Sequence, residues 1–263
     1  MNNIHQTAII EDGATIGENV TVGAFSIIGK NVIIGDGTTV SSHTLIEGKT
    51  TIGKDNRIFS HAVLGTIPQD LKFDGEETEL IIGDNNTIRE HTLLNTGTAG
   101  GGSKTVVGNG CLLMGHVQIG HDCILGDNIV VANSCAIAGH VEIDDNVVVG
   151  GMSAIHQFCK IGEQSMIGGG SILVQDIPPF CICEGNRATL RALNINGLRR
   201  RFRDSRSDID AIKKAYKEIF ESGNPIADVA NDILENSDNQ YAKQLAKFIA
   251  NTKRGIPFIR KEK

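Results

Sequence analysis

The sequence predicts an all-β solenoid, a left-handed parallel β-helix, followed by a C-terminal helical domain. Three observations predict it: an aliphatic residue recurs every six positions, glycine often follows that residue, and the spacing becomes helical near the C-terminus. The 263 residues include 31 glycines and no tryptophan, and only 4% are aromatic. Aliphatic side chains must therefore fill the core. We expect the solenoid in residues 1–186 and the helical domain in residues 187–263.

The six-residue repeat runs in two series, from Ile4 to Leu94 and from Val107 to Leu173. A period of six fits neither a helix nor a hairpin meander. It is typical of short strands that each point one aliphatic residue inward before the chain turns a corner, where Gly or Asn tolerates a left-handed backbone. Three strands make a coil, and about nine coils would stack into a prism roughly 40–45 Å long. Such prisms coil left-handed, against the usual crossover rule.

Two segments interrupt the repeat, residues 66–79 and residues 97–104. Insertions in a solenoid lie on its surface and often build the binding site. The alternative is a tolerated surface insertion without a role.

The last part of the chain has helical spacing. Ile209, Ile212 and Ile219 form one apolar stripe, a second follows Asn224-Pro225, and a third includes Leu245. We therefore expect a small helical domain that also caps the last coil of the prism.

Composition and charge exclude several classes of protein. A 40% hydrophobic content and a net charge of −6 argue against disorder. The longest apolar runs are too short for a membrane span, and the N-terminus does not resemble a signal peptide, so we expect a cytoplasmic protein. Residues 1–186 hold 8 basic and 21 acidic residues, whereas residues 187–263 hold 17 and 10. The basic end suits an anionic ligand or an acidic partner protein.

Four cysteines occupy one small inward position of the repeat, because Cys111, Cys123, Cys135 and Cys159 lie 12, 12 and 24 residues apart. This spacing favours buried structural side chains over a metal site. Cys181 and Cys183 form a C-x-C pair that we expect in a loop, and six cysteines in so long a chain do not suggest a disulfide framework.

Several histidines fall on one predicted edge of the prism. His121 lies two positions after the aliphatic Ile119, and steps of one coil lead to Gly139-His140 and then to His156-Gln157. A ladder of imidazoles on a surface edge has no packing rationale, and neutral imidazole is the natural general base near pH 7. Asp122 follows His121 directly.

A metal site at the histidines and a nucleic-acid site at the arginines are both weaker interpretations. His116 and His121 resemble the histidine spacing of gamma-class carbonic anhydrases, but Glu79 and Leu80 stand where a third histidine is needed, so we expect no metal. The arginine-rich stretch from Arg187 to Arg206 has only Phe202 as a stacking platform, which argues against nucleic acid. A phosphate group or an acidic carrier protein fits it better.

The chain closely resembles the bacterial UDP-N-acetylglucosamine acyltransferases that begin lipid A synthesis. The resemblance covers nearly the whole chain. It is carried by Gln69-Asp70-Leu71-Lys72, Ile88-Arg89-Glu90, Gly120-His121-Asp122-Cys123, Ala138-Gly139-His140-Val141, the run from Gly150 to Phe158, Gln175-Asp176-Ile177-Pro178-Pro179 and Gly185-Asn186.

The resemblance implies a homotrimer with active sites between neighbouring prisms, an (R)-3-hydroxyacyl donor on acyl carrier protein, a UDP-sugar acceptor and no cofactor. From the residues themselves we expect no nucleic-acid partner and no stable membrane insertion. The resemblance makes His121 the general base, Asp122 the support of its imidazole and the Gly139 N–H the donor to the oxyanion.

The resemblance also assigns substrate-binding roles. Gln69, Asp70 and Lys72 would hold the acyl chain and pantetheine, and His140, His156 and Gln157 would line the sugar and nucleotide site. Asn194, Arg200 and Arg201 would meet the nucleotide phosphates or the carrier.

The chain departs from its relatives at Asn95, Gln118 and Arg187, where they commonly have histidine. Asn95 and Gln118 fall near the expected sugar site, so a 3-amino sugar is an alternative acceptor to the 3-hydroxyl sugar. Gly169 and Arg187 fall where the family measures acyl length, and Gly169 leaves room for a 3-hydroxymyristoyl-like chain. The alternatives to the O-acyltransferase are an N-acyltransferase on a 3-amino UDP-sugar and a non-catalytic β-helix scaffold.

Overall fold

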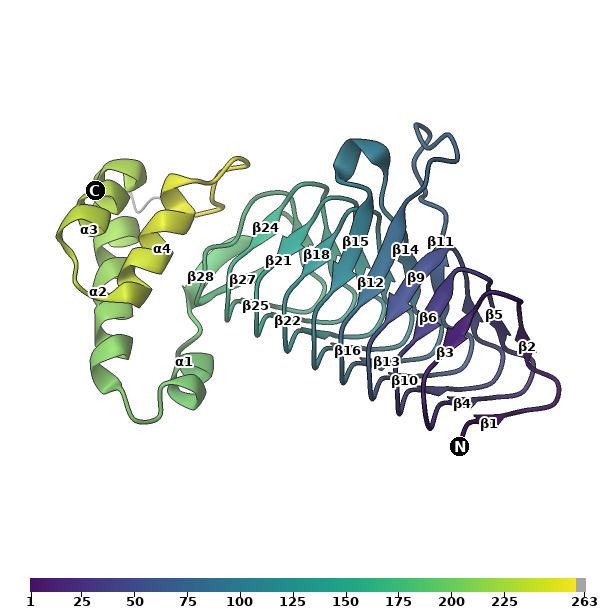
Figure 1. The fold of residues 1–263 in the computed structure, drawn as a ribbon. Coiled ribbons are helices and arrows are strands. Elements are labelled where there is room, and N and C mark those ends of the chain that lie inside the picture. The colour runs from purple at the N-terminus through teal and green to yellow at the C-terminus, as the bar shows by residue number, and fades with distance from the viewer. Residues whose placement is uncertain (259–263) are drawn as a thin grey trace.

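The computed structural model describes residues 1–258, which form a three-sided prism of stacked coils followed by a group of helices (Figure 1). From β1 to β26, neighbouring strands in each sheet are three apart in the chain, so the chain visits the three faces in turn. The first sheet contains β1 (Asn3–Ile4), β4 (Thr21–Val22), β7 (Thr39–Val40), β10 (Arg57–Ile58), β13 (Thr87–Ile88), β16 (Leu112–Leu113), β19 (Val130–Val131), β22 (Val148–Val149), β25 (Met166–Ile167), β27 (Cys181–Glu184) and β28 (Thr189–Leu193).

The other two faces have the same construction. The second sheet contains β2 (Ile9–Ile10), β5 (Ile27–Ile28), β8 (Leu45–Ile46), β11 (Val63–Thr66), β14 (Leu93–Asn95), β17 (Gln118–Ile119), β20 (Ala136–Ile137), β23 (Ala154–Ile155) and β26 (Ile172–Leu173). The third sheet contains β3 (Thr15–Ile16), β6 (Val32–Ile34), β9 (Lys49–Ile52), β12 (Glu79–Ile82), β15 (Lys104–Val107), β18 (Ile124–Leu125), β21 (Glu142–Ile143) and β24 (Lys160–Ile161). The predicted left-handed parallel β-helix is confirmed.

The aliphatic residues of the repeat form the core of the prism. Ile119 of β17 pairs with Ile137 of β20, which pairs with Ile155 of β23, and at most 2% of each is exposed. Strand geometry turns the preceding residue outward. In β18, Ile124 is 39% exposed whereas Leu125 is 1% exposed. The four cysteines of the repeat are also buried, and burial raises the pKa of Cys123 to about 12, as expected for structural thiols.

Many corners of the prism have a left-handed backbone at residues other than the expected Gly or Asn. Among residues 1–258, nineteen non-glycine residues have positive φ, including His43, Asp122 and Phe158. The glycine that often follows the aliphatic residue is needed for close packing and not for a left-handed backbone. A Cβ at Gly35 would lie 2.6 Å from the backbone carbon of Gly53, so this glycine permits the close approach of successive coils.

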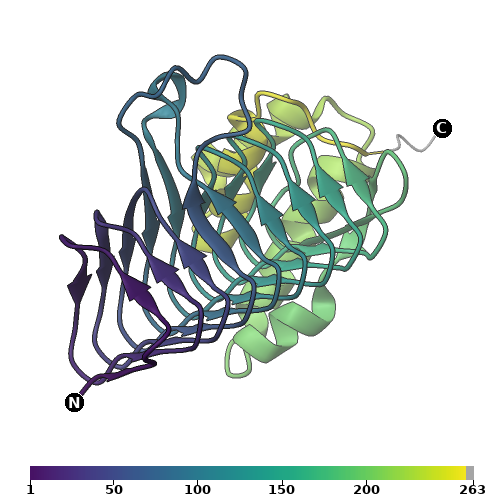
Figure 2. The same ribbon diagram turned by 90° about the vertical axis from the view of Figure 1, so that its right-hand side faces the viewer.

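Both predicted excursions leave the prism where the chain passes from the second sheet to the third. We call this corner the loop edge. Residues 66–79 connect β11 to β12, and the segment between β14 and β15 contains a short 3-10 helix, η1 (Ala99–Gly101). The two excursions project side by side from the prism (Figures 1 and 2).

The C-terminal part contains four helices, α1 (Ile195–Arg201), α2 (Arg206–Glu221), α3 (Ile226–Asn236) and α4 (Gln240–Ala250), and they pack around a separate apolar core. The helical spacing predicted the last three and missed α1. Cys181 and Cys183 lie in β27, not in a loop as expected, because β27 extends the first sheet and pairs antiparallel with β28. Residues 189–193, which we placed in the helical domain, therefore form a strand.

Polar contacts fix the helices to the end of the prism. The buried Asp176 accepts hydrogen bonds from Thr252 Oγ1 at 2.6 Å and from the Lys160 N–H at 2.8 Å. Gln244 of α4 donates to Glu163 at 2.7 Å. Within residues 1–258, no helix has the length and apolarity that crossing a membrane requires.

Candidate active site

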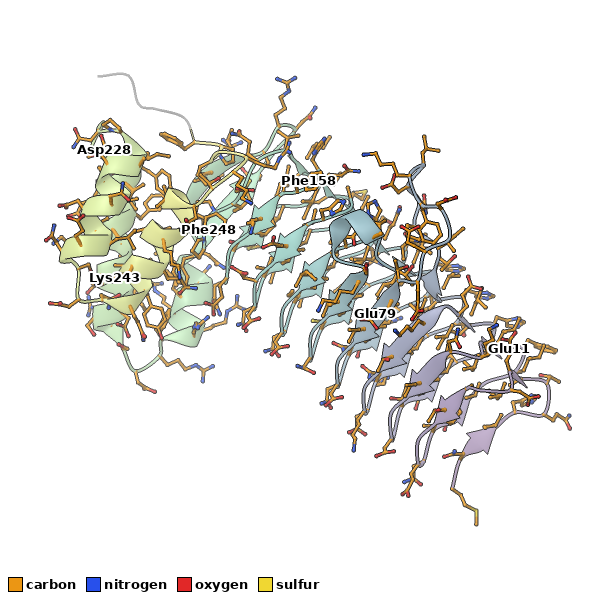
Figure 3. The ribbon with its side chains drawn as sticks, turned by 45° about the horizontal axis from the view of Figure 1, so that its top comes forward. Glu11, Glu79, Phe158, Asp228, Lys243 and Phe248 are labelled. Carbon is orange, nitrogen blue, oxygen red and sulfur yellow. The ribbon has the colours of Figure 1, made fainter. Side chains whose placement is uncertain are left out.

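The predicted ladder of residues lies along the loop edge. The His140 N–H donates to the His121 carbonyl at 2.9 Å, and the Phe158 N–H donates to the Gly139 carbonyl at 3.3 Å. His121, Gly139 and Gln157 therefore occupy successive coils, as expected. Phe158 marks this edge beside the two excursions in Figure 3.

His121 and Asp122 form a buried pair at the corner after β17. His121 Nδ1 lies 2.8 Å from Asp122 Oδ2, and the residues are only 6% and 4% exposed. A carboxylate accepts, so Nδ1 is the donor, and in the neutral ring Nε2 has the lone pair. Nε2 has no hydrogen-bond partner within residues 1–258.

Gly139 lies directly against the His121 ring. A Cβ at position 139 would lie 2.5 Å from His121 Cε1 and 2.6 Å from Nε2. The Gly139 N–H donates no hydrogen bond to any residue between 1 and 258. An unpaired backbone donor thus lies beside an imidazole nitrogen with a free lone pair.

His140 forms the next part of the site. Its ring meets the His121 ring edge-on, with centroids 4.9 Å apart, and stacks on Phe158 at 4.4 Å. Burial lowers the pKa of His140, and the positive charge that His121 can carry also lowers it. Asp122 opposes this shift. His140 is therefore neutral at pH 7.

The first excursion brings its charged residues toward His140. Asp70 raises the pKa of His140 and Lys72 lowers it, so both act on the ring through space. The loop also has local order, since the Lys72 N–H donates to Asp70 Oδ1 at 3.0 Å. Gln69 is exposed beside them.

The remaining candidates of this edge lie around the pair. Asn95 is 1% exposed and its Nδ2 donates to the Ile67 carbonyl at 2.8 Å, which ties β14 to the first excursion. Its Oδ1 is the one buried side-chain oxygen or nitrogen without a partner in the described chain. Gln118 is half-buried on β17, and His156 and Gln157 are exposed.

Gly169 and Arg187 do not join this site. Gly169 lies where the chain passes from the first sheet to the second, between β25 and β26, and Arg187 lies in the turn of the β27–β28 hairpin.

Arg200 and Arg201 belong to α1, and Asn194 is its N-cap residue. Asn194 accepts from the Gly197 N–H at 3.1 Å as the helix cap and donates to the Gln164 carbonyl, so its contacts in one chain are structural. Arg201 pairs with Glu163 and Arg200 is exposed.

A cation would fit the pair poorly. His121, Asp122 and His140 each offer a ligand atom within 4.8 Å of the others. Both Asp122 oxygens already accept hydrogen bonds, Oδ1 from the Thr98 N–H and Oδ2 from Thr98 Oγ1 and His121. Such a donor set holds a charged carboxylate in place without metal.

Two features of the structure were not predicted from the sequence. Thr98 binds Asp122 from the second excursion, and only tertiary structure brings the two together. The other feature is a column of stacked imidazoles at the corner where the chain passes from the first sheet to the second, with centroids 4.7 to 5.1 Å apart. It contains His43, His61, His91 and His116. The spacing of 18 residues between His43 and His61 was a usable signal.

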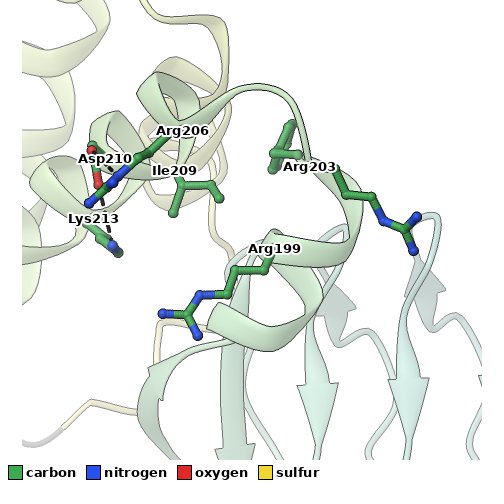
Figure 4. Close-up of a pocket in the computed structure, with 7 residues that line it drawn as sticks. Arg199, Arg203, Arg206, Ile209, Asp210 and Lys213 are labelled. Atoms are coloured by element: carbon green, nitrogen blue, oxygen red, sulfur yellow. Dashed lines mark hydrogen bonds and ion pairs between the residues drawn. The ribbon is translucent and has the colours of Figure 1, made fainter.

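The basic stretch forms a hollow of about 520 Å³ between α1 and α2 (Figure 4). Its charged lining has one acid, Asp210, which lies within ion-pair distance of Arg206 and Lys213. The hollow is lined by Arg199, Phe202, Arg203, Arg206, Ile209, Asp210 and Lys213.

The chain thus forms a hexapeptide-repeat prism with a buried His–Asp pair at its edge. Two family models match the chain, and both give its class as a transferase. Residues 13–48 match "Bacterial transferase hexapeptide (six repeats)", and residues 176–257 match "Udp N-acetylglucosamine O-acyltransferase; Domain 2".

Curated relatives and solved structures narrow the class. The chain is 67% identical over 261 residues to the acyl-[acyl-carrier-protein]–UDP-N-acetylglucosamine O-acyltransferase of Aliarcobacter butzleri, covering 99% of this chain and 100% of that one. It is 60% identical to the Sulfurovum enzyme of that name over 99% and 100% of the two chains. The structure of the UDP-N-acetylglucosamine acyltransferase from Campylobacter jejuni matches with a TM-score of 0.93 and 43% identity, over 98% and 100% of the chains. The chain belongs to the acyl-[acyl-carrier-protein]–UDP-N-acetylglucosamine O-acyltransferase family and is an acyltransferase.

Proposed function

We propose that this enzyme transfers an (R)-3-hydroxyacyl group from acyl carrier protein to the 3-hydroxyl of UDP-N-acetylglucosamine, the first step of lipid A biosynthesis. The names of its relatives support both substrates. The observation that carries the proposal is the His121 ring, held by Asp122 through Nδ1 with Nε2 free beside the unpaired Gly139 N–H.

These groups account for each part of the reaction. His121 Nε2 takes the proton of the 3-hydroxyl as that oxygen attacks the thioester carbonyl carbon. A C–O bond forms, and the Gly139 N–H stabilises the oxyanion. The C–S bond then breaks, and the imidazolium returns its proton to the carrier's thiolate. Asp122 keeps Nδ1 protonated and stabilises the transient imidazolium.

The substrates would bind on either side of His121. Gln69, Asp70 and Lys72 of the first excursion would hold the acyl chain and pantetheine, because this loop faces His140. Along the same edge, His140, His156 and Gln157 would contact the sugar and nucleotide.

The positions of the remaining candidates support a homotrimer. Gly169 and Arg187 lie off the loop edge that carries the His121 of their own chain. In a trimer they would line the site of a neighbouring copy and limit acyl length, with room at Gly169 for a 3-hydroxymyristoyl-like chain. Asn194, Arg200 and Arg201 would likewise meet the neighbour's nucleotide phosphates or its carrier protein.

A 3-amino UDP-sugar is the second candidate acceptor, and attack by its amine would give an amide. The Asn95 side chain favours it. Its Oδ1 has no partner in the described chain, and an amide oxygen can only accept. After His121 removes one proton, an attacking amine still has an N–H that can donate to Asn95 Oδ1. A hydroxyl has no hydrogen left to donate.

The test is an assay with hydroxyacyl carrier protein and both UDP-sugars in competition, with the products identified by mass spectrometry. His121→Ala should lower turnover by about 10²–10⁴-fold. His43→Ala, in the imidazole column of the other corner, should leave it unchanged. Wild-type turnover by the His121 variant would remove the proposed base. Failure to bind either substrate would favour a non-catalytic scaffold.

A further inference from the structure

The second excursion holds the Asp122 carboxylate with two hydrogen bonds from one residue. The Thr98 backbone N–H donates to Oδ1 at 2.8 Å, and Thr98 Oγ1 donates to Oδ2 at 2.6 Å. Oδ2 is also the oxygen that binds His121 Nδ1. The three residues thus form a buried chain of hydrogen bonds that ends at the free Nε2.

The Thr98 side chain does not cap η1, although its position favours capping. Thr98 is the N-cap residue of η1, where a threonine hydroxyl normally binds a backbone N–H of the first turn. No such cap bond forms. Since the hydroxyl points to the carboxylate instead, local helix stability does not explain this side chain.

Gly101 covers the same carboxylate from the end of η1. A Cβ at position 101 would lie 2.0 Å from Asp122 Cγ. Any side chain there would displace either the carboxylate or the turn. Its neighbour Gly100 has nothing within 4 Å of an added Cβ, so close packing is specific to Gly101.

The segment is held in place by the first excursion. The Ala99 N–H, next to Thr98, donates to Glu76 Oε1 at 3.1 Å. This bond is the main reason that the pKa of Glu76 is lowered, so Glu76 remains an anion that can hold the turn.

We propose that Thr98 and Gly101 are positioning residues for the transfer reaction, acting through Asp122 on His121. The inference rests on the proposed role of His121 as the base. A carboxylate fixed by Thr98 and covered by Gly101 cannot rotate away from Nδ1, so Nε2 keeps its lone pair and its direction. Both residues contact Asp122, and neither is among those proposed to bind the acyl or sugar substrate. Their loss should therefore affect the rate of transfer and leave substrate binding intact.

The hydroxyl is tested with Thr98→Val, Thr98→Ser and a matched control, Thr78→Val. The valine variant should lower kcat at least tenfold while KM for both substrates stays within twofold, and serine should restore kcat to within threefold. Thr78 donates a buried hydroxyl hydrogen bond to Thr96 in the same loop region without touching Asp122, so its valine variant should keep wild-type kcat.

The packing is tested with Gly101→Ala against Gly100→Ala. The first should lower kcat at least tenfold, and the second should not change it. Melting temperatures of all variants separate this effect from unfolding.

The outcomes distinguish the inference from the function on which it rests. Wild-type kcat in Thr98→Val and Gly101→Ala, with His121→Ala inactive, would overturn the positioning role alone. An equal loss in Thr98→Val and Thr78→Val, or in Thr98→Val and Thr98→Ser, would also overturn it. Full activity of His121→Ala would overturn the proposed function.

Discussion

The ring of His121 rests on the backbone of Gly139, one coil further along the prism. A Cβ at position 139 would come within 2.6 Å of His121 Nε2, so the only side chain that fits there is a hydrogen. This contact places an imidazole lone pair and an unpaired backbone N–H at one point of the surface. The coil spacing of the β-helix creates it.

Gly139→Ala should therefore abolish most of the activity. The added methyl group would push the imidazole away from the acceptor and shift the N–H, and we expect turnover to fall by about 10²-fold or more. Steady-state rates measure this. Gly115→Ala is the control, because its Cβ would come no closer than 3.2 Å to the Asn133 side chain and 3.5 Å to the Glu90 carbonyl oxygen. Equal rates in the two variants would contradict the proposed contact.

Asp122→Asn should reduce kcat with little change in KM. The amide has nearly the shape of the carboxylate but loses the charge that stabilises the imidazolium, and about 10²-fold is expected. Asp127→Asn is a matched control, since the half-buried Asp127 accepts the Asn109 N–H at 2.7 Å at another corner. An active Asp122 variant would show that His121 needs no anion.

Acid should destabilise the protein partly through His140. Its pKa in the folded state is lowered by burial, so below the ordinary value of 6.5 the unfolded chain binds more protons than the folded chain. The stability from this group is full above pH 6.5 and is lost as pH falls through the folded-state pKa. His140→Phe keeps the stacking on Phe158 but cannot titrate. Between pH 7.5 and 5.5 its melting temperature should fall less than that of the wild type, and parallel curves would refute this.

Neighbouring residues of one strand should differ sharply in their contribution to stability. Ile34 of β6 is 1% exposed, whereas Ile33 is 47% exposed. Ile34→Ala should lower the free energy of unfolding by about 2–5 kcal/mol, and Ile33→Ala by about 0.5 kcal/mol or less. Urea denaturation measures both. Similar values would mean that the two faces of the strand are not inside and outside.

Charge reversal in the basic hollow should weaken binding of the acidic carrier. The double variant Arg203→Glu and Arg206→Glu should raise KM for acyl carrier protein about tenfold and leave KM for the UDP-sugar within twofold. Added salt should reduce the difference. Lys30→Glu, an exposed change near the N-terminal end of the prism, controls for net charge. An unchanged KM for the carrier would place its docking surface elsewhere.

The sequence by itself determined the prism, because one inward aliphatic residue per six requires three short strands per coil. That period alone is enough to predict His121, Gly139 and Gln157 on one edge. It also predicted both excursions and three of the four helices. It missed α1, whose seven residues have too few apolar positions to show a helical stripe.

Only the tertiary structure decided what surrounds the reactive pair. Thr98 and Gly101 reach Asp122 because the second excursion folds back onto the prism, and no periodicity encodes the path of an irregular loop. Likewise, Gly169 and Arg187 proved to lie away from the His121 of their own chain. A repeat specifies contacts between successive coils, whereas contacts made by loops and across corners depend on the packing of the whole chain.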